Sequence, residues 1–332
     1  MNRRRISIAV FLSFMMMFVM ISGCGGGSDD APSLDYISAN IGILKYVPGG
    51  AFQRDVTTTN ISNVSAFRMS EKEITRQQFF DIMGTDPSNP AFSSGSMSDP
   101  VQQVNWYHAI AFCNKLSIAE GLTRVYDVAG FDTDQDWIDL DFGDIPTPID
   151  SRDATWDAAT ANWSANGYRL PTEMEWMWAA MGATSALGYE SPTYLTGYGK
   201  LFAGSNATNA AGDNGTNLIG DYVWYVDNSS STSHPVGTTG TTGHANELGL
   251  YDMSGNVSEW CWDWGDDYPT GNVVDYRGPD TASVDWSEYR INRGGTWGSN
   301  PHPTEEVLTV SGRDSYGPER QISSLGIRVV RN

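Results

Sequence analysis

Beyond residue 40 the hydrophobic residues come in short runs separated by polar turns, a pattern that predicts many short strands and few helices. The clearest alternation covers residues 259–264. It places Trp260, Trp262 and Trp264 on one face of a strand and Glu259, Cys261 and Asp263 on the other. Further strands are predicted over residues 46–52, 66–74, 290–297, 307–313 and 326–330.

Helices are predicted where a capping signal precedes an apolar periodic segment. The signals are Thr75 with Gln78 before a helix that runs to about Met83, Asn105 before a helix over 106–120, and Thr172 with Glu175 before a third helix. The spacing of Trp176, Met177, Ala180 and Met181 on the third helix favours core packing over a cofactor site.

The first thirty residues carry the pattern of an export signal. Three arginines precede an almost unbroken apolar run over 6–21, which is short for a membrane span. The small residues before Cys24 resemble a bacterial lipobox. This resemblance implies that 1–23 is a signal peptide, that Cys24 is lipidated and that 24–40 is a flexible tether. An ordinary signal peptide with an incidental cysteine is the alternative.

The chain of 332 residues has 40 acidic residues against 20 lysines and arginines, a formal net charge of -20. Removing residues 1–23 takes away three arginines and leaves -23. Such a charge repels nucleic acid and anionic membrane surfaces, so we expect neither as a partner. No repeat or composition break divides residues 41–332, which are expected to form one domain.

Two polar stretches are expected to lie outside regular structure. Residues 132–157 are rich in aspartate, and the spacing of Asp132, Asp134 and Asp136 suggests calcium. Trp137 and Gly143 stand where a calcium loop of the EF-hand type needs glycine and glutamate, so a solvated acidic loop is favoured. Residues 187–243, rich in Gly, Asn, Ser and Thr, are expected to be long ordered loops.

Familiar catalytic motifs are missing from the sequence. It contains no G-x-S-x-G turn, no phosphate-binding loop and no Cys/His cluster with zinc spacing. The histidines occur singly, at His108, His234, His244 and His302. Besides Cys24 the chain has Cys113 and Cys261, which form either one disulfide or two buried thiols.

Several separate motifs follow one another along residues 41–332. They are VPGGAF (47–52), EITRQQF (73–79), PVQQVNW (100–106), GYRLPTE (167–173), NELGLYDMSGNV (246–257), EW (259–260), RGGTW (293–297) and LGIRV (325–329). This series resembles the formylglycine-generating-enzyme, or sulfatase-modifying-factor, domain family. The resemblance implies an α+β domain, a C-type lectin-like fold with much irregular structure, in which Arg169 and Glu259 are buried, paired charges.

Enzymes of that family hold copper with two cysteines that follow the Arg-Gly-Gly motif. At the corresponding places this chain has residues near Ser299 and Thr304, and no cysteine follows Cys261. A hydroxyl does not replace a thiolate as a soft copper ligand. We therefore expect no catalytic residue; an enzyme of the same fold and a structural envelope protein are the alternatives.

Residues 290–332 also resemble the variable region of retroelement-diversified proteins, among them treponemal variable proteins, which vary exposed residues on a C-type lectin scaffold. The resemblance implies a ligand-binding patch made of Trp297, Gly298, Ser299, Asn300, His302, Thr304, Glu305, Ser311, Asp314, Ser315, Tyr316, Glu319, Gln321 and Ile322. The alternative is that this segment forms only loops and edge strands of an inactive family member.

These expectations describe a monomeric lipoprotein that binds an unknown protein or glycan. It would be held by palmitate or a similar acyl chain in the bacterial cell envelope, on the outer membrane and exposed at the surface. No cofactor is required. The family resemblance implies one calcium candidate, formed by backbone at Gly255 and Val257 with the Glu259 side chain.

Overall fold

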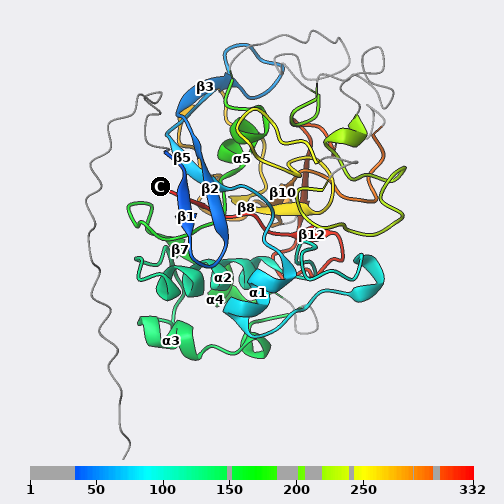
Figure 1. Cartoon of the computed structure of the whole chain (residues 1–332). Helices are drawn as coiled ribbons and strands as arrows, with labels where there is room; N and C mark the ends of the chain where they lie inside the picture. The colour runs from blue at the N-terminus through cyan, green and yellow to red at the C-terminus, as the bar shows by residue number, and fades with distance from the viewer. Residues whose placement is uncertain are drawn as a thin grey trace, which may run out of the picture. The chain divides into compact units, whose positions relative to one another are not determined.

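Two four-stranded sheets organise the computed structural model of this chain (Figure 1). The structure describes residues 34–147, 152–184, 201–205, 219–238, 243–286, 288–301 and 307–332. One sheet has the order β1 (Tyr36–Ser38), β2 (Gly42–Val47), β5 (Phe67–Ser70) and β13 (Val330–Arg331). The other has the order β11 (Arg313–Tyr316), β10 (Arg290–Arg293), β8 (Ser258–Trp264) and β12 (Leu325–Gly326). Each sheet therefore joins segments that are far apart in the sequence.

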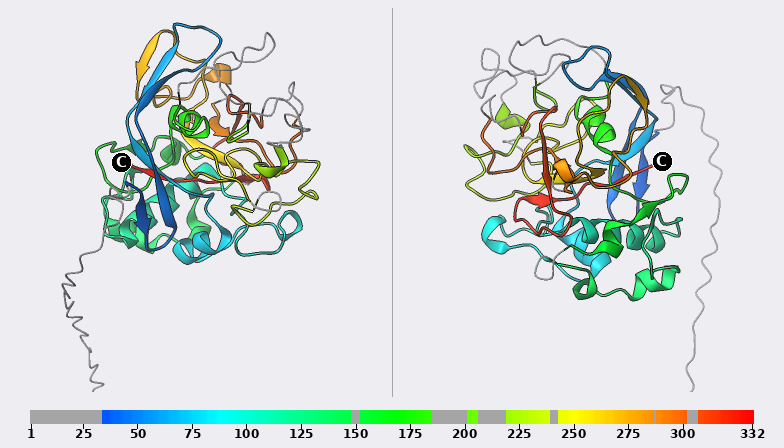
Figure 2. Two further views of the ribbon diagram at one scale, coloured as in Figure 1. Left: turned by 45° about the horizontal axis from the view of Figure 1, so that its top comes forward. Right: turned by 180° about the vertical axis from the view of Figure 1, so that it is seen from behind.

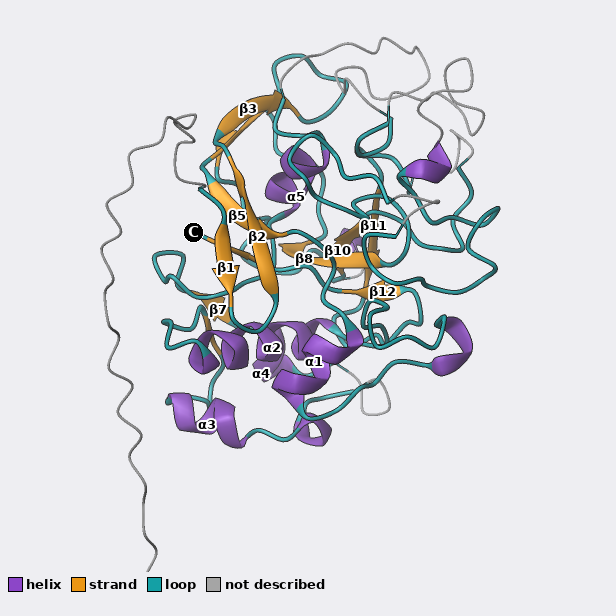
Figure 3. Ribbon diagram, in the orientation of Figure 1, coloured by secondary structure: helices purple, strands orange, loops and turns teal. Residues whose placement is uncertain are grey.

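Smaller sheets and short helices complete the described part. The sheets are β3 (Gly50–Gln53), β4 (Ile61–Val64) and β9 (Asn272–Val274), and β6 (Tyr126–Asp127) with β7 (Thr160–Ala161). The α-helices are α1 (Arg76–Met83), α2 (Trp106–Ala119), α3 (Asp134–Asp139), α4 (Ala154–Asp157) and α5 (Glu173–Ala180). The 3-10 turns are η1 (Pro90–Phe92), η2 (Phe142–Asp144), η4 (Ile219–Asp221) and η5 (Val284–Trp286). Helices α1–α4 gather on one side, whereas α5 lies among the strands (Figures 2 and 3). The α+β fold class with much irregular structure is confirmed.

The capping signals are confirmed at all three predicted helices. Thr75 and Thr172 each accept a hydrogen bond from the backbone three residues later, and Gln78 and Glu175 complete the boxes. Asn105 caps α2, with His108 as the reciprocal partner. These contacts satisfy backbone N–H groups that the first helical turn leaves without partners.

The two faces of β8 enter two different hydrophobic clusters. Trp260 packs into the cluster built around α2, whereas its neighbour Cys261 packs into the cluster built around α5. The predicted alternation is therefore confirmed, and both faces of the strand are buried because helices or sheets cover each of them. Trp176 and Met177 of α5 are fully buried, as expected of core residues.

Two strand predictions near the C-terminus need correction. The strand predicted over 290–297 ends at Arg293, because Gly294 and Gly295 have φ values of 99° and 67° that no strand contains. The strand predicted over 307–313 is made of turns, and β11 begins only at Arg313. The carbonyls of Ser311 and Gly312 accept hydrogen bonds from the Arg293 side chain instead of from a neighbouring strand.

The predicted tether is too long, and the predicted acidic loop is wrong in part. Residues 36–38 form β1, which pairs with β2, so the tether cannot extend to residue 40. In the acidic segment, Thr133 caps α3 and Trp137 is fully buried. Burial of that large apolar ring orders a segment whose composition alone suggests a solvated loop. Much of 187–243 lies outside the described residues.

Leu34–Asn332 forms one compact unit. Cys113 and Cys261 are both buried free thiols, which answers the open question of the disulfide in this structure. Burial raises the pKa of each thiol well above its ordinary value. Within the part of the chain that the structure describes, no helix has both the length and the apolar character needed to cross a bilayer.

Candidate functional site

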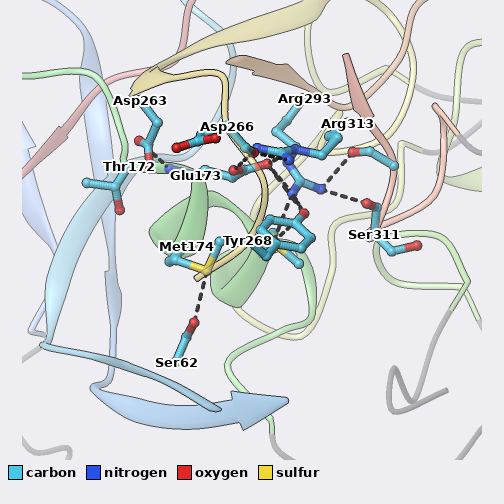
Figure 4. Close-up of polar contacts among 12 residues, drawn as sticks. Ser62, Thr172, Glu173, Met174, Asp263, Asp266, Tyr268, Arg293, Ser311 and Arg313 are labelled. Carbon is cyan, nitrogen blue, oxygen red and sulfur yellow. Dashed lines mark hydrogen bonds and ion pairs between the residues drawn. The ribbon is translucent and has the colours of Figure 1, made fainter. Parts of the chain in front are cut away.

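The residues that flank the segment from Gly294 to Gly312 lie next to each other in one sheet. Arg293 ends β10 and Arg313 begins β11, and the two residues are paired directly across the sheet. Both arginines bind the carboxylate of Glu173 at the start of α5 (Figure 4). Arg313 approaches it with two nitrogens, at 2.8 and 2.7 Å. We call Glu173, Arg293 and Arg313 the arginine clamp.

The clamp is buried and electrostatically matched. The side chains of Arg293 and Glu173 are 0% and 2% exposed, and that of Arg313 is 17% exposed. Burial alone would raise the pKa of Glu173, but the two guanidinium groups outweigh it and hold this pKa below its ordinary value. Arg313 also stacks on Tyr268, 4.4 Å from the ring centre. Charge-assisted bonds of this kind are stronger than neutral ones and fix geometry as well.

A second contact holds the beginning of the segment. Gly255 has φ of 79° and donates its N–H to the Gly294 carbonyl at 2.7 Å. A Cβ at Gly255 would lie 2.1 Å from the Trp224 carbonyl oxygen, so only glycine fits there. The carbonyl of the next residue, Asn256, accepts a hydrogen bond from the Trp297 N–H at 2.7 Å. The Gly-Asn turn therefore positions the backbone of Trp297.

Three loops meet around Trp297. Its ring stacks on Phe92 with 5.7 Å between ring centres, and its carbonyl accepts a hydrogen bond from the Ser229 hydroxyl at 2.8 Å. The N–H of Val226 donates to the carbonyl of Ser299 at 3.1 Å. We call the surface formed by residues 90–94, 224–234 and 294–300 the three-loop surface. The segment with η1 and loop 219–238 lies at the right of Figure 1.

Parts of this surface are exposed to solvent. Gly298 and Asn300 are exposed, and Val226 is 45% exposed. Trp297 and Phe92 are half-buried. An aromatic pair with an exposed apolar and an exposed amide side chain next to it is a typical composition of a binding surface, because it combines contact area with directional hydrogen bonds.

The predicted patch residues are not all on this surface. Trp297, Gly298, Ser299 and Asn300 belong to it. Ser311, Asp314, Ser315 and Tyr316 continue along and before β11, where Asp314 is exposed. Because β11 runs antiparallel to β10, these residues lead away from the loop, and Tyr316 lies opposite Arg290 at the far end of the pair. His302, Thr304 and Glu305 lie outside the described residues.

The last three predicted patch residues contribute to packing. Gln321 donates its side-chain amide to the Gln103 carbonyl at 3.0 Å, and Ile322 packs against the cluster around α2. The Glu319 carbonyl accepts a hydrogen bond from Asn105, the α2 N-cap, at 3.4 Å. All three side chains are half-buried. These contacts hold residues 319–322 against the region around α2, and the three side chains remain partly exposed to solvent.

Sequence reasoning missed Phe92 and Val226. Phe92 lies in the stretch 87–100, which is rich in Ser and Pro, and nothing in this local sequence indicates that Trp297 stacks on it. An aromatic residue isolated in a polar loop was the one available signal. Val226 follows Trp224 in a loop that pairs with residue 299 only in three dimensions.

The calcium candidate loses its side-chain ligand. One Glu259 oxygen accepts hydrogen bonds from Arg328 at 2.8 Å, and the other accepts one from the Trp176 indole at 2.6 Å. Arg169 pairs with Glu175 instead, so the two expected buried charges are each paired, but not with one another. Among the residues that the structure describes, no cluster of three His, Cys, Asp or Glu side chains is arranged to hold a metal ion. Cys24 lies outside the described residues.

This combination of a mixed fold, an Arg-Gly-Gly turn and a Gly-Asn turn is that of the sulfatase-modifying factor enzyme 1-like domain, whose family model matches residues 42–332. The chain belongs to this family. It is 32% identical to chaperone protein LppX of Paenibacillus barcinonensis over 328 residues, covering 96% of this chain and 98% of that protein. The structure of Treponema denticola variable protein 1 is similar, with 32% identity, a TM-score of 0.70, and coverage of 90% of this chain and 98% of that one.

Enzymes are also among the relatives. The formylglycine-generating enzyme of Streptomyces coelicolor is 29% identical over 180 residues, covering 52% of this chain and 50% of that enzyme. Two relatives that cover nearly the whole chain are thus a variable protein and a protein named as a chaperone, which is consistent with a member of this fold that lacks catalysis.

Proposed function

We propose that this protein is a non-catalytic binding protein, which recognises a protein or glycan through the three-loop surface and the adjoining edge strand β11. The observation that carries the proposal is the arginine clamp. The residues that flank the segment 294–312 are fixed on one buried carboxylate, so its exposed residues, such as Gly298 and Asn300, can change without disturbing this attachment. Loops held on a rigid scaffold are where proteins most often place binding residues.

Two observations support the absence of the family's oxidative chemistry. No cysteine follows Cys261, so the segment after Arg293 offers no thiolate pair for copper. Cys113 and Cys261 are buried, and burial raises the pKa of both thiols. A buried thiol of raised pKa is a poor nucleophile and a poor metal ligand. Thiol-dependent oxygen uptake by the copper-treated protein would contradict this part of the proposal.

Binding is tested on arrays of glycans and extracellular-matrix proteins with the purified full chain. Trp297→Ala is expected to weaken binding of any positive probe by about tenfold or more, as the loss of an aromatic anchor does, and Asn300→Ala is expected to weaken it less. Asp132→Ala, an exposed change in the acidic segment, is the matched control and should leave affinity unchanged. Equal affinity of all three variants would contradict the assignment of the surface.

Diversification is tested on the DNA beside the gene. The proposal expects a near-copy of the 3′ end that differs mainly at adenines, next to a reverse-transcriptase gene. The expected differences fall in codons for residues 297–322, whereas the codons for Arg293 and Arg313 stay constant. If the gene has no such copy beside it, the hypothesis of diversification is contradicted, and the binding surface would be invariant.

Anchoring in the envelope rests on the N-terminal sequence. Residues 1–23 and Cys24 are proposed to direct lipidation, after which the acyl chains hold the protein at the outer membrane. Radiolabelled palmitate should be incorporated by the native protein and not by Cys24→Ser. Protease added to intact cells should degrade the native protein if it faces outward, and an intact protein would contradict surface exposure.

A second candidate is assistance to another exported protein, which is favoured by the similarity over 96% of the chain to a protein named as a chaperone. The two candidates differ in selectivity. A chaperone should suppress light scattering of several unrelated unfolding proteins, such as citrate synthase, whereas a receptor should suppress none and bind one folded partner.

A further inference from the structure

A separate cavity of about 320 Å³ lies on a different part of the domain from the three-loop surface. Its walls come from the turn between β4 and β5, the start of α5, the turn that carries Trp163 and the segment after β9. Asn332 also lines it, so the C label in Figure 1 marks its position, across the domain from loop 219–238. The volume lies within the range of small-molecule pockets.

Two of the four charged side chains that line this cavity, Arg169 and Glu175, neutralise each other. Arg169 holds Glu175 with two hydrogen bonds of 2.6 and 2.7 Å, and its second terminal nitrogen also donates to the Asn332 side chain at 2.9 Å. These three side chains form a fixed wall whose net charge is zero. A ligand gains little electrostatic attraction from them.

Two opposite charges in the same cavity have no ionic partner among the described residues. Asp275 accepts hydrogen bonds from the backbone and the hydroxyl of Ser65, at 2.7 and 2.8 Å, but contacts no cation. Arg277 is exposed, and its guanidinium lies 4.2 Å from the centre of the Trp163 ring. Asp275 is positioned by neutral donors and Arg277 by an aromatic ring. Each charged group therefore remains able to bind a ligand group of opposite charge.

Apolar side chains line the same cavity as these charges. Trp163 is half-buried, with its ring edge-on to Trp262 at 5.7 Å and 87°, so its orientation is fixed. Val64, Ala66 and Met174 line the same cavity. The site therefore offers one anion, one cation and an apolar wall in a space that holds a single small molecule.

We propose that this cavity binds a small zwitterion of the amino-acid class that carries an apolar side chain. The ligand's ammonium group would bind Asp275, its carboxylate would bind Arg277, and its side chain would contact Trp163 and Met174. A ligand with only one charge leaves either the aspartate or the arginine without a partner. The inference does not depend on the three-loop surface, because none of these residues belongs to it.

The test uses three probes of one shape and the purified full chain. The probes are L-methionine, 3-(methylthio)propylamine, which lacks the carboxylate, and 4-(methylthio)butanoate, which lacks the ammonium group. Calorimetry should show methionine binding about tenfold or more tightly than either analogue, the ratio expected when one charged contact contributes about 1.4 kcal/mol. Methionyl-methionine in the same assay distinguishes a peptide terminus from a free amino acid as the source of the zwitterion.

Charge variants make the assignment specific to each residue. Arg277→Gln should weaken methionine and the butanoate and leave the amine unchanged, whereas Asp275→Asn should weaken methionine and the amine and leave the butanoate unchanged. Arg320→Gln, at an arginine that is 62% exposed and does not line the cavity, should change nothing. No binding of methionine at about 10 mM, well above the dissociation constants of ordinary weak ligands, would overturn the proposal. Equal affinity of the three probes, or indifference to both cavity variants, would overturn it as well.

Discussion

Replacing Glu173 by glutamine tests whether the arginine clamp supports the segment 294–312. The change keeps the shape of the side chain but leaves Arg293, whose side chain is 0% exposed, without a counter-charge. Breaking a buried pair by removing one partner costs about 3–5 kcal/mol. Two arginines lose their carboxylate here, but Arg313 is 17% exposed and water compensates part of its loss. We therefore expect about 3–5 kcal/mol less unfolding free energy.

The assay is urea unfolding followed by circular dichroism, with hydrogen exchange on the folded variant. In a parallel thermal melt, a loss of 3–5 kcal/mol corresponds to a fall in Tm of about 5–8 °C for a domain of this size. The rate of amide hydrogen exchange should rise most at residues 296–300 and 308–312, because the arginine clamp that holds the ends of this segment is weakened. Glu71→Gln is the control. Glu71 lies 3.6 Å from Lys45 in a pair of which both sides are more than 20% exposed, so its loss should cost less than about 1 kcal/mol.

The pH dependence gives a second reading of the same clamp. The pKa of Glu173 is lowered in the folded protein, so its stabilisation is present above the ordinary carboxyl pKa and disappears as pH falls through the lower, folded value. The difference between the native protein and Glu173→Gln should therefore shrink in acid. If the variant loses less than about 1 kcal/mol at pH 7, or if exchange rises evenly over the domain, the clamp does not support the loop in the way we describe.

Three further predictions address other parts of the fold. Burial raises the pKa of Asp252 to about 6, so the stability that its protonated carboxyl contributes should be lost as pH rises from about 4 through 6, and Asp252→Asn should make the unfolding free energy from urea titrations less dependent on pH in this range. Gly255→Ala should cost more than about 2 kcal/mol because its Cβ would collide with a backbone carbonyl, whereas Gly271→Ala, with φ of 78° and open space, should cost only about 1 kcal/mol in thermal melts. Cys113 and Cys261 should resist Ellman's reagent in the native protein and react in guanidinium, and fast reaction of either in the native state would contradict their burial.

Local signals predicted the helices well because their physics is local. The capping box at Thr75 needs only residue Gln78, and the one at Thr172 needs only Glu175, so a sequence window of four residues contains the whole interaction. The alternation over 259–264 was equally reliable, since a strand sends successive side chains to opposite faces whatever surrounds it.

Predictions failed where distant residues decide the conformation. The strand expected over 307–313 is absent because Arg293 takes the carbonyls at its end. The acidic segment forms α3 because Trp137 finds a buried site against other aromatic rings. The predicted patch was only partly a surface, since Gln321 and Ile322 turn toward Gln103 and the core.

The sequence by itself determined the family, the class of fold, the beginnings of α1, α2 and α5, and the residues of the Arg-Gly-Gly and Gly-Asn turns. It also showed that no cysteine follows Cys261. Only the tertiary structure decided which charges meet. Glu173 binds arginines 120 and 140 residues further along the chain, and Asp275 and Arg277 become significant only because a cavity closes around them. The physical reason is that caps and alternation act between neighbours in the chain, whereas ion pairs and cavities depend on how distant segments are brought together.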